Sequence, residues 1–188
     1  MSQIRPAVAA DAVALAALAA ETFPLACPPG TEDSEIERFV SQHLSAERFR
    51  EYLRDPEAFV VVCESDPGLV GYTLLFDGFD HAPEPSYGVR GDKPAFMSKL
   101  YVVPERHGTE VAAALMAAGI SWARGRGASS LWLAVNQQNR RAARFYTKHG
   151  FEPVGVKTML VGQTVHDDFV YELDLRTAPG VAPNSPRN

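Results

Sequence analysis

A strand, a helix and a second strand follow one another between residues 95 and 135, and this succession limits the fold more than any other feature. Residues 95–103, "AFMSKLYVV", predict a strand, and residues 110–127 predict a helix with one apolar face. The run "SLWLAV" at residues 130–135 is apolar on both sides, as in a strand buried on both faces of a sheet. Such a unit favours parallel pairing of its two strands. The chain is therefore expected to fold around a sheet that contains a parallel pair.

The other segments predict strands and helices that extend this unit into an α/β fold. The turn residues "SDPG" separate two β-rich runs at residues 58–64 and 69–76, which indicates a hairpin. Further strands are expected near residues 4–6, 151–161 and 169–175. Helices are expected at residues 11–23, from Ser34 with a capping box to Glu37, after the N-cap Ser45, and at residues 139–150. This order predicts a mixed central sheet of about seven strands with helices on both faces.

The length of 188 residues suits one domain, which we expect to span residues 1–176. Residues 177–188, "TAPGVAPNSPRN", contain three prolines and no apolar face, so a disordered tail is expected there. The polar segment at residues 77–93 is expected to be a solvated loop, with contact to a substrate as the alternative.

Composition argues against several classes of function. The net charge of −5 disfavours nucleic acid as the main partner, since phosphate backbones demand clustered Lys and Arg. Cys27 and Cys63 are too few and too far apart to suggest a zinc site, and no metal is expected. The first residues lack the apolar core of a signal peptide, and no run approaches membrane-spanning length. A cytoplasmic protein without a membrane partner is therefore expected.

The segment "ERHGTEVAAALM", residues 105–116, lies between the predicted strand and the predicted helix. A turn at that place presents backbone N–H groups and the positive end of a helix dipole, which together bind anions such as phosphate. We call residues 105–112 the cradle. Gly108 allows close backbone approach, but Glu110 adds a carboxylate. An inward carboxylate would cost about 1–4 kcal/mol by repulsion, so we favour an outward orientation. The alternative is that the segment only opens an amphipathic helix.

Two segments, "LYVVPERHGTEVAAALM" and "NQQNRRAARFYTKHGFEPVG", resemble the two signature regions of the GCN5-related N-acetyltransferases. The resemblance extends from Ile4 to Leu175. It implies a mostly antiparallel sheet, acetyl-CoA as co-substrate, and direct transfer of the acetyl group to a primary amine. In that family the cradle carries Gln or Arg, then Gly, then Gly or Ala, at positions that are His107, Glu110 and Ala112 here. Only Ala112 fits, so phosphate binding weaker than in a glycine-rich relative is expected.

The resemblance also assigns roles to particular residues. In the family, the strand before the cradle separates from its neighbour, and its N–H groups stabilise an oxyanion. Tyr101 to Val103 occupy that place here, so the resemblance implies that they offer these donors. Tyr146 would protonate the leaving thiolate, because a phenol keeps its proton at neutral pH. Tyr146 equally suits the edge of a core. Contacts with the coenzyme are implied for Tyr101, Val102, Val103, His107, Gly108, Thr109, Glu110, Val111, Ala112 and Asn139.

Several of these coenzyme contacts have alternatives or possible helpers nearby. Asn139 is already explained as the N-cap of its helix. In the cradle, the Thr109 hydroxyl and the charge of Arg106 or His107 can add to the backbone donors. The basic side chains of the later helix either meet the 3′-phosphate of coenzyme A or are solvated, and they are Arg140, Arg141, Arg144 and Lys148.

The resemblance does not identify the base that deprotonates the amine. Many relatives carry Glu at the position of Phe96 in this chain. Deprotonation would then fall to a water chain or to an acidic or histidine side chain elsewhere. The candidate side chains are equally explained as turn or loop residues, and they are His166, Asp167, Asp168, Asp77 and Asp80. The run at residues 166–168 has the further alternative of recognising a cationic amine by charge.

The acceptor is expected to be a small amine, first a polyamine-like or other cationic amine. This expectation depends on the negative net charge and on the ending "GQTVHDDFVYELDL", which is similar to polyamine acetyltransferases. One alternative is a protein N-terminal or peptide acceptor, and another is a non-catalytic acyl-CoA-binding member of the fold. The sequence also permits a homodimer.

Overall fold

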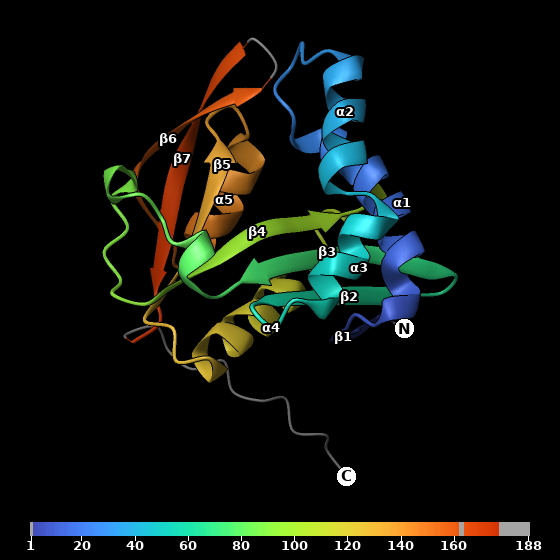
Figure 1. The fold of residues 1–188 in the computed structure, drawn as a ribbon, viewed down its shortest axis with the longest axis horizontal. Coiled ribbons are helices and arrows are strands. Elements are labelled where there is room, and N and C mark those ends of the chain that lie inside the picture. The colour runs from blue at the N-terminus through green and yellow to red at the C-terminus, as the bar shows by residue number, and fades with distance from the viewer. Residues whose placement is uncertain (1, 162–163, 177–188) are drawn as a thin grey trace.

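The computed structural model describes residues 2–161 and 164–176, so the expected tail at residues 177–188 lies outside the described residues. A seven-stranded sheet with the order β1-β2-β3-β4-β5-β7-β6 forms the centre (Figure 1). The pair of β4 and β5 is parallel and the other neighbouring pairs are antiparallel, which confirms the predicted fold class. The strands are β1 (Gln3–Pro6), β2 (Ala58–Ser65), β3 (Gly68–Phe76), β4 (Pro94–Val102), β5 (Ser130–Asn136), β6 (Glu152–Val161) and β7 (Thr164–Asp174).

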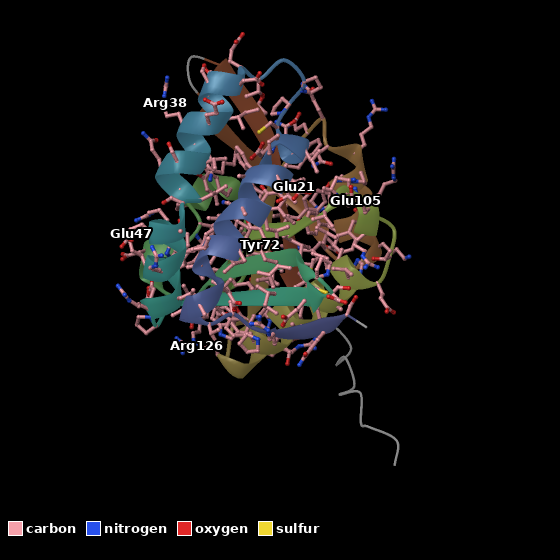
Figure 2. The ribbon with its side chains drawn as sticks, turned by 90° about the vertical axis from the view of Figure 1, so that its right-hand side faces the viewer. Glu21, Arg38, Glu47, Tyr72, Glu105 and Arg126 are labelled. Carbon is pink, nitrogen blue, oxygen red and sulfur yellow. The ribbon has the colours of Figure 1, made fainter. Side chains whose placement is uncertain are left out.

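Helices cover both faces of the sheet, as predicted. Alternate residues of β3 show this: Leu74 packs in a cluster with α1 and α3, whereas Leu75 packs in a cluster with α4 and Tyr146 of α5. Figure 2 shows Tyr72 in the interior, while Arg38 and Glu47 point outward from α2 and α3. The helices are α1 (Ala12–Thr22), α2 (Asp33–His43), α3 (Ala46–Arg54), α4 (Val111–Gly125) and α5 (Arg140–Lys148).

Two of the three predicted helix caps are confirmed. The Ser45 hydroxyl accepts a hydrogen bond from the Arg48 N–H at 3.3 Å, and the Asn139 side chain accepts from the Ala142 N–H at 3.1 Å. The capping box at Ser34 is wrong, because α2 begins at Asp33 and Glu32 occupies the N-cap position.

We expected that no apolar run would be long enough to span a membrane. By length and composition alone, this expectation is wrong. A continuous helical stretch, Ala9–Ala26, is long and apolar enough to cross a membrane. It continues through Pro24 because proline fits the first positions of the short 3₁₀ turn Phe23–Ala26. In this structure one side of the stretch, including Leu15 and Ala19, packs with Phe49 in the core.

A β-bulge in β4 fixes which side chains reach each face of the sheet. Leu74 pairs with Lys99, but Leu75 pairs with Met97, so Ser98 is an extra residue. Phe96 and Lys99 therefore lie on the same face, although a regular strand would place residues three apart on opposite faces.

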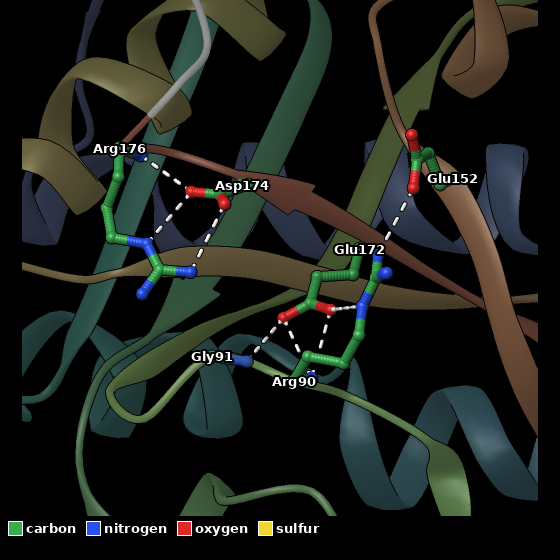
Figure 3. A network of polar contacts seen from close by, with 6 residues as sticks. All are labelled: Arg90, Gly91, Glu152, Glu172, Asp174 and Arg176. Carbon is green, nitrogen blue, oxygen red and sulfur yellow. Dashed lines mark hydrogen bonds and ion pairs between the residues drawn. The ribbon is translucent and has the colours of Figure 1, made fainter.

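Glu172 of β7 attaches the segment at residues 77–93 to the sheet (Figure 3). Its side chain is 4% exposed and accepts hydrogen bonds from the backbone N–H groups of Arg90 at 3.0 Å and Gly91 at 2.8 Å. The Arg90 guanidinium adds contacts to Glu172 and to the exposed Glu152. This loop is therefore hydrogen-bonded to the sheet and is not merely solvated, and it contains the short turns Phe79–His81 and Pro85–Tyr87.

Candidate active site

A cavity of about 390 Å³ lies where β4 and β5 separate. The ladder between these strands covers only Pro94–Phe96 and Ser130–Trp132, and beyond it the two strands diverge (Figure 1). The cavity is lined by the second half of β4, the end of β5, α5, α2 and the segment after α1. A gap at this place leaves one edge of β4 without a partner strand, so its polar groups face the cavity.

The structure brings about half of the predicted site residues to this cavity. Those that line it are Tyr101, Val102, His107, Asn139 and Tyr146. The rest of the predicted set continues from β4 toward the start of α4 without lining the cavity, and it comprises Val103, Gly108, Thr109, Glu110, Val111 and Ala112.

The backbone N–H groups that face the gap belong to Leu100 and Val102. The Val103 N–H donates to the Val70 carbonyl of the β3 side at 3.0 Å. Because N–H directions alternate along an antiparallel strand, Tyr101 also donates toward β3, and Leu100 and Val102 point the opposite way. The expectation that Tyr101 to Val103 all offer donors is thus corrected: Val102 remains, and Leu100 joins it.

The cradle keeps part of its predicted set of donors. The N–H groups of His107 and Thr109 donate to carbonyls inside the turn, at 3.0 and 3.3 Å. The Val111 N–H donates to the Thr109 hydroxyl, which itself donates to the Arg106 carbonyl, so this hydroxyl is not available as a donor. Arg106 points to Ser65. Within the described part of the chain, four amides in this region have no acceptor, namely those of Gly108, Glu110, Ala112 and Ala113.

Gly108 shapes the turn through its backbone conformation. Its φ is +77°, a value that side chains with a Cβ rarely adopt, and no atom would contact an added Cβ. The glycine is therefore required by the turn, and not by a neighbouring group.

Glu110 lies at the N-cap position of α4 with an exposed side chain that does not line the cavity. We predict that Glu110→Gln changes the Kd for coenzyme A by about twofold or less, because an exposed charge is screened by solvent. Isothermal calorimetry measures this, with Glu105→Gln as the control from the same turn. Tightening by about tenfold for Glu110→Gln alone would mean that the carboxylate points at the anion.

His107 joins the cradle to α5. Its Nδ1 receives a hydrogen bond from Arg141, which can only donate, so a neutral ring carries its proton on Nε2. Nε2–H then donates to the Val102 carbonyl at 2.8 Å. His107, in the place of the family's Gln or Arg, therefore fixes the turn after β4 against the first turn of α5.

Tyr146 packs in the core and also lines the cavity. The residue is 8% exposed, and its ring centre lies 5.7 Å from that of Phe151 and 6.2 Å from that of Tyr171. Burial raises the pKa of Tyr146 well above its ordinary value, so the phenol keeps its proton at neutral pH. The predicted core-edge and proton-donor descriptions therefore both fit its geometry.

Among the described candidates for the base, Asp168 lines the cavity, where it accepts a hydrogen bond from the Asn136 side chain at 3.5 Å. Asp77 pairs with Arg126 at 2.8 Å, and Asp167 accepts from the Thr158 hydroxyl at 3.0 Å, so both are engaged elsewhere. Asp80 does not line the cavity. The His166 side chain lies outside the described residues. Phe96, at the family's Glu position, stacks on Trp132 at 4.3 Å.

Sequence reasoning missed two lysines that line the cavity, Lys99 and Lys157. A signal for Lys99 existed, because a charged residue within the apolar run "FMSKLYVV" is unusual for a central strand. Lys157 gave no comparable signal, since its strand is partly exposed.

Comparisons with known proteins agree with this geometry. The model of the acetyltransferase (GNAT) family matches residues 19–151. An uncharacterized N-acetyltransferase of Mycobacterium tuberculosis (strain H37Rv) is 43% identical over 165 residues, which is 88% of this chain and 98% of that protein. An uncharacterized N-acetyltransferase of Bacillus subtilis (strain 168) is 26% identical over 79% of this chain and 89% of its own length.

A solved structure shows the same fold. The PaiA N-acetyltransferase from Thermoplasma acidophilum, in complex with coenzyme A, aligns with a TM-score of 0.73 at 20% identity, over 93% of this chain and 99% of that chain. The family match covers well over half of the chain, and the mycobacterial relative is covered almost completely. The predicted enzyme class is thereby confirmed, and this chain belongs to the acetyltransferase (GNAT) family.

Proposed function

We propose that this N-acetyltransferase transfers the acetyl group of acetyl-CoA to the nitrogen of a small primary amine in the cavity between β4 and β5. The observation that carries the proposal is that one cavity is lined by Tyr146, by Asp168 and by the part of β4 that has no partner strand on this side. Bound acetyl-CoA supplies the thioester carbonyl that a neutral amine attacks.

The coenzyme would extend from this cavity to the cradle. The four amides without acceptors at the start of α4 and the positive end of its dipole suit a diphosphate. Arg141, at the cavity wall beside His107, adds a positive charge on the same side. Asn139 is already occupied as a helix cap through its Oδ1, so its contribution is to hold the first turn of α5 in place.

Three kinds of group at the cavity have separate chemical roles in this proposal. The N–H groups of Leu100 and Val102 stabilise the negative charge that develops on the carbonyl oxygen. Asp168 accepts the proton that the amine loses. Tyr146 gives its proton to the sulfur as the carbon–sulfur bond breaks, so the new amide and the free thiol group are both uncharged.

The class of amine stays a prediction. The polyamine-like acceptor expected from the sequence and a peptide amino group remain candidates. The cavity volume of about 390 Å³ suits a small molecule, which supports a small amine over a protein as the acceptor.

An amine panel tests the proposal. The purified chain is mixed with acetyl-CoA and polyamines, amino acids, simple amines or a short peptide, and free thiol release is followed. We expect turnover with at least one small amine. Calorimetry with coenzyme A separates the alternatives: binding without turnover supports a non-catalytic acyl-CoA-binding protein, whereas no binding at millimolar concentration contradicts the placement of the coenzyme.

A further inference from the structure

Two ammonium groups without carboxylate partners line the cavity. The Lys99 Nζ donates to the Ser98 hydroxyl at 3.0 Å and lies 5.9 Å from the centre of the Phe39 ring of α2. The Lys157 Nζ lies 5.6 Å from the centre of the Tyr87 ring. Within the part of the chain that the structure describes, neither lysine forms an ion pair. Neither charge is therefore neutralised by an ion pair among these residues, although Asp168 lies opposite Lys157 on β7.

The electrostatic state of Lys99 agrees with an unmatched charge. Burial, and secondly the positive charge of Lys157, lower the pKa of Lys99 to about 8. A carboxylate bound between the two lysines would oppose both effects, because an anion close to an ammonium group favours the charged form. The protein as a whole has a net charge of −5, so this pair of cations is a local feature of the cavity.

The same cavity also holds negative charge and an apolar wall. Asp168 stands in register with Lys157 on β6 and with Asn136 on β5, so a carboxylate and an ammonium group come from neighbouring strands. Phe23 and Phe39 stack on each other at 4.5 Å and line the cavity. Separated positive and negative groups beside an apolar surface are complementary to a zwitterion with an apolar body.

We propose, on the basis of the function proposed above, that the acceptor is a small amine that also carries a carboxylate, as an amino acid does. Lys99 and Lys157 bind the carboxylate, and Asp168 receives the amino group. A polyamine offers no negative group to either lysine and would add its own charges beside them. Lys99 is thus a specificity-determining residue, and its role is to select the acceptor.

Matched pairs of acceptors test this inference. Phenylalanine is compared with 2-phenylethylamine and leucine with 3-methylbutylamine, and spermidine represents the polyamines. With saturating acetyl-CoA, kcat/KM is measured by thiol release. We expect the amino acid of at least one pair to be preferred by about tenfold or more, because a charge-assisted pair with a partly buried lysine is lost in the decarboxylated amine.

Lys99→Met removes the charge and keeps most of the length of the side chain. The variant should lose most of the preference through a higher KM for the amino acid, while its kcat/KM for the decarboxylated amine stays near the wild-type value. That second activity also shows that the variant folds. Lys157→Met should act in the same direction. Arg38→Met is the control, because it removes a positive charge from the outer side of α2, away from the cavity (Figure 2).

The pH dependence of this preference tests the role of Lys99 independently. As pH rises through about 8, free Lys99 loses its proton, so the preference for the amino acid over its decarboxylated partner should fall. The other charged or titratable residues that line the cavity are Lys157, Arg141, His107, Asp168, Glu35, Cys27, Tyr101 and Tyr146. His43 lies beside Phe39, and its own pKa is lowered by burial and by Arg48 and Lys99. Taking the ratio of the two acceptors cancels the titration of the amines to a first approximation, since both must lose a proton.

The outcomes separate this inference from the proposed function. If wild-type enzyme acetylates spermidine or the decarboxylated amines as efficiently as the amino acids, or if Lys99→Met keeps the full preference, the inference is wrong and the proposed function stands. If no amine is acetylated, both are wrong.

Discussion

Replacing Tyr146 with phenylalanine is expected to lower kcat about 100-fold, with the Kd for coenzyme A almost unchanged. Positioned proton donors typically contribute about 10²–10⁴-fold, and a factor of 100 corresponds to about 2.7 kcal/mol of barrier. The ring of Tyr146 packs against Phe151 and Tyr171 and is kept in the variant, so the core loses no apolar volume. Only the proton for the leaving sulfur is removed.

Tyr171→Phe is the matched control for this experiment. Tyr171 is 5% exposed, belongs to the same core cluster and does not line the cavity. Steady-state rates with acetyl-CoA and the best amine, together with calorimetry, measure both variants. Equal turnover of Tyr146→Phe and the wild-type enzyme would assign the residue to the core alone, and an equal loss in both variants would indicate a general effect of removing a buried hydroxyl.

The second large effect concerns stability. Glu172→Leu should lower the free energy of unfolding by about 1–3 kcal/mol, because it leaves the partly buried N–H groups of Arg90 and Gly91 without this acceptor. Urea unfolding followed by circular dichroism measures the change. Turnover below the unfolding transition should change little, since Glu172 does not line the active-site cavity.

Glu152→Leu is the control, since Glu152 contacts the same arginine from a position where its side chain is 71% exposed. An exposed ion pair contributes at most about 1 kcal/mol, so this variant should remain close to the wild type. If both variants unfold at the same urea concentration, the bonds from the two backbone amides do not stabilise the fold as we infer.

The contribution of Glu172 should also depend on pH. Burial alone would raise the pKa of Glu172, but hydrogen bonds outweigh this effect and lower it overall, chiefly those from the Arg90 amide, the Ser130 hydroxyl and the Gly91 amide. The stability is therefore fully present above the unfolded-state pKa of about 4.3 and is lost as pH falls through the lower folded-state value. The difference between wild type and Glu172→Leu should shrink over that range.

The sequence predicted the architecture well because its signals were local. The order of elements, the parallel pair of β4 and β5, and the caps at Ser45 and Asn139 all follow from periodicity and short-range hydrogen bonding. The capping box predicted at Ser34 was wrong because a helix tolerates serine in its first turn, and Glu32 occupies the N-cap position instead.

The site was predicted less completely because its details depend on contacts between distant segments. No local sequence pattern indicates that the Val103 N–H donates to the Val70 carbonyl, or that the Leu100 N–H faces the gap. The pairing of His107 with Arg141 joins residues 34 positions apart. Lys99 and Lys157 line one cavity only because β4 and β6 both reach it.

The extra residue at Ser98 has a consequence for how this chain tolerates change. Removing it would leave Met97 and Lys99 adjacent and opposite Leu75 and Leu74, so β4 would alternate regularly and Phe96 and Met97 would keep their faces. Phe96 would keep its stack with Trp132, and the Lys99 ammonium would lose the hydroxyl to which it donates. A one-codon deletion at this position therefore removes only the bulge, whereas elsewhere in a regular strand it would exchange the faces of the side chains on one side of the deletion.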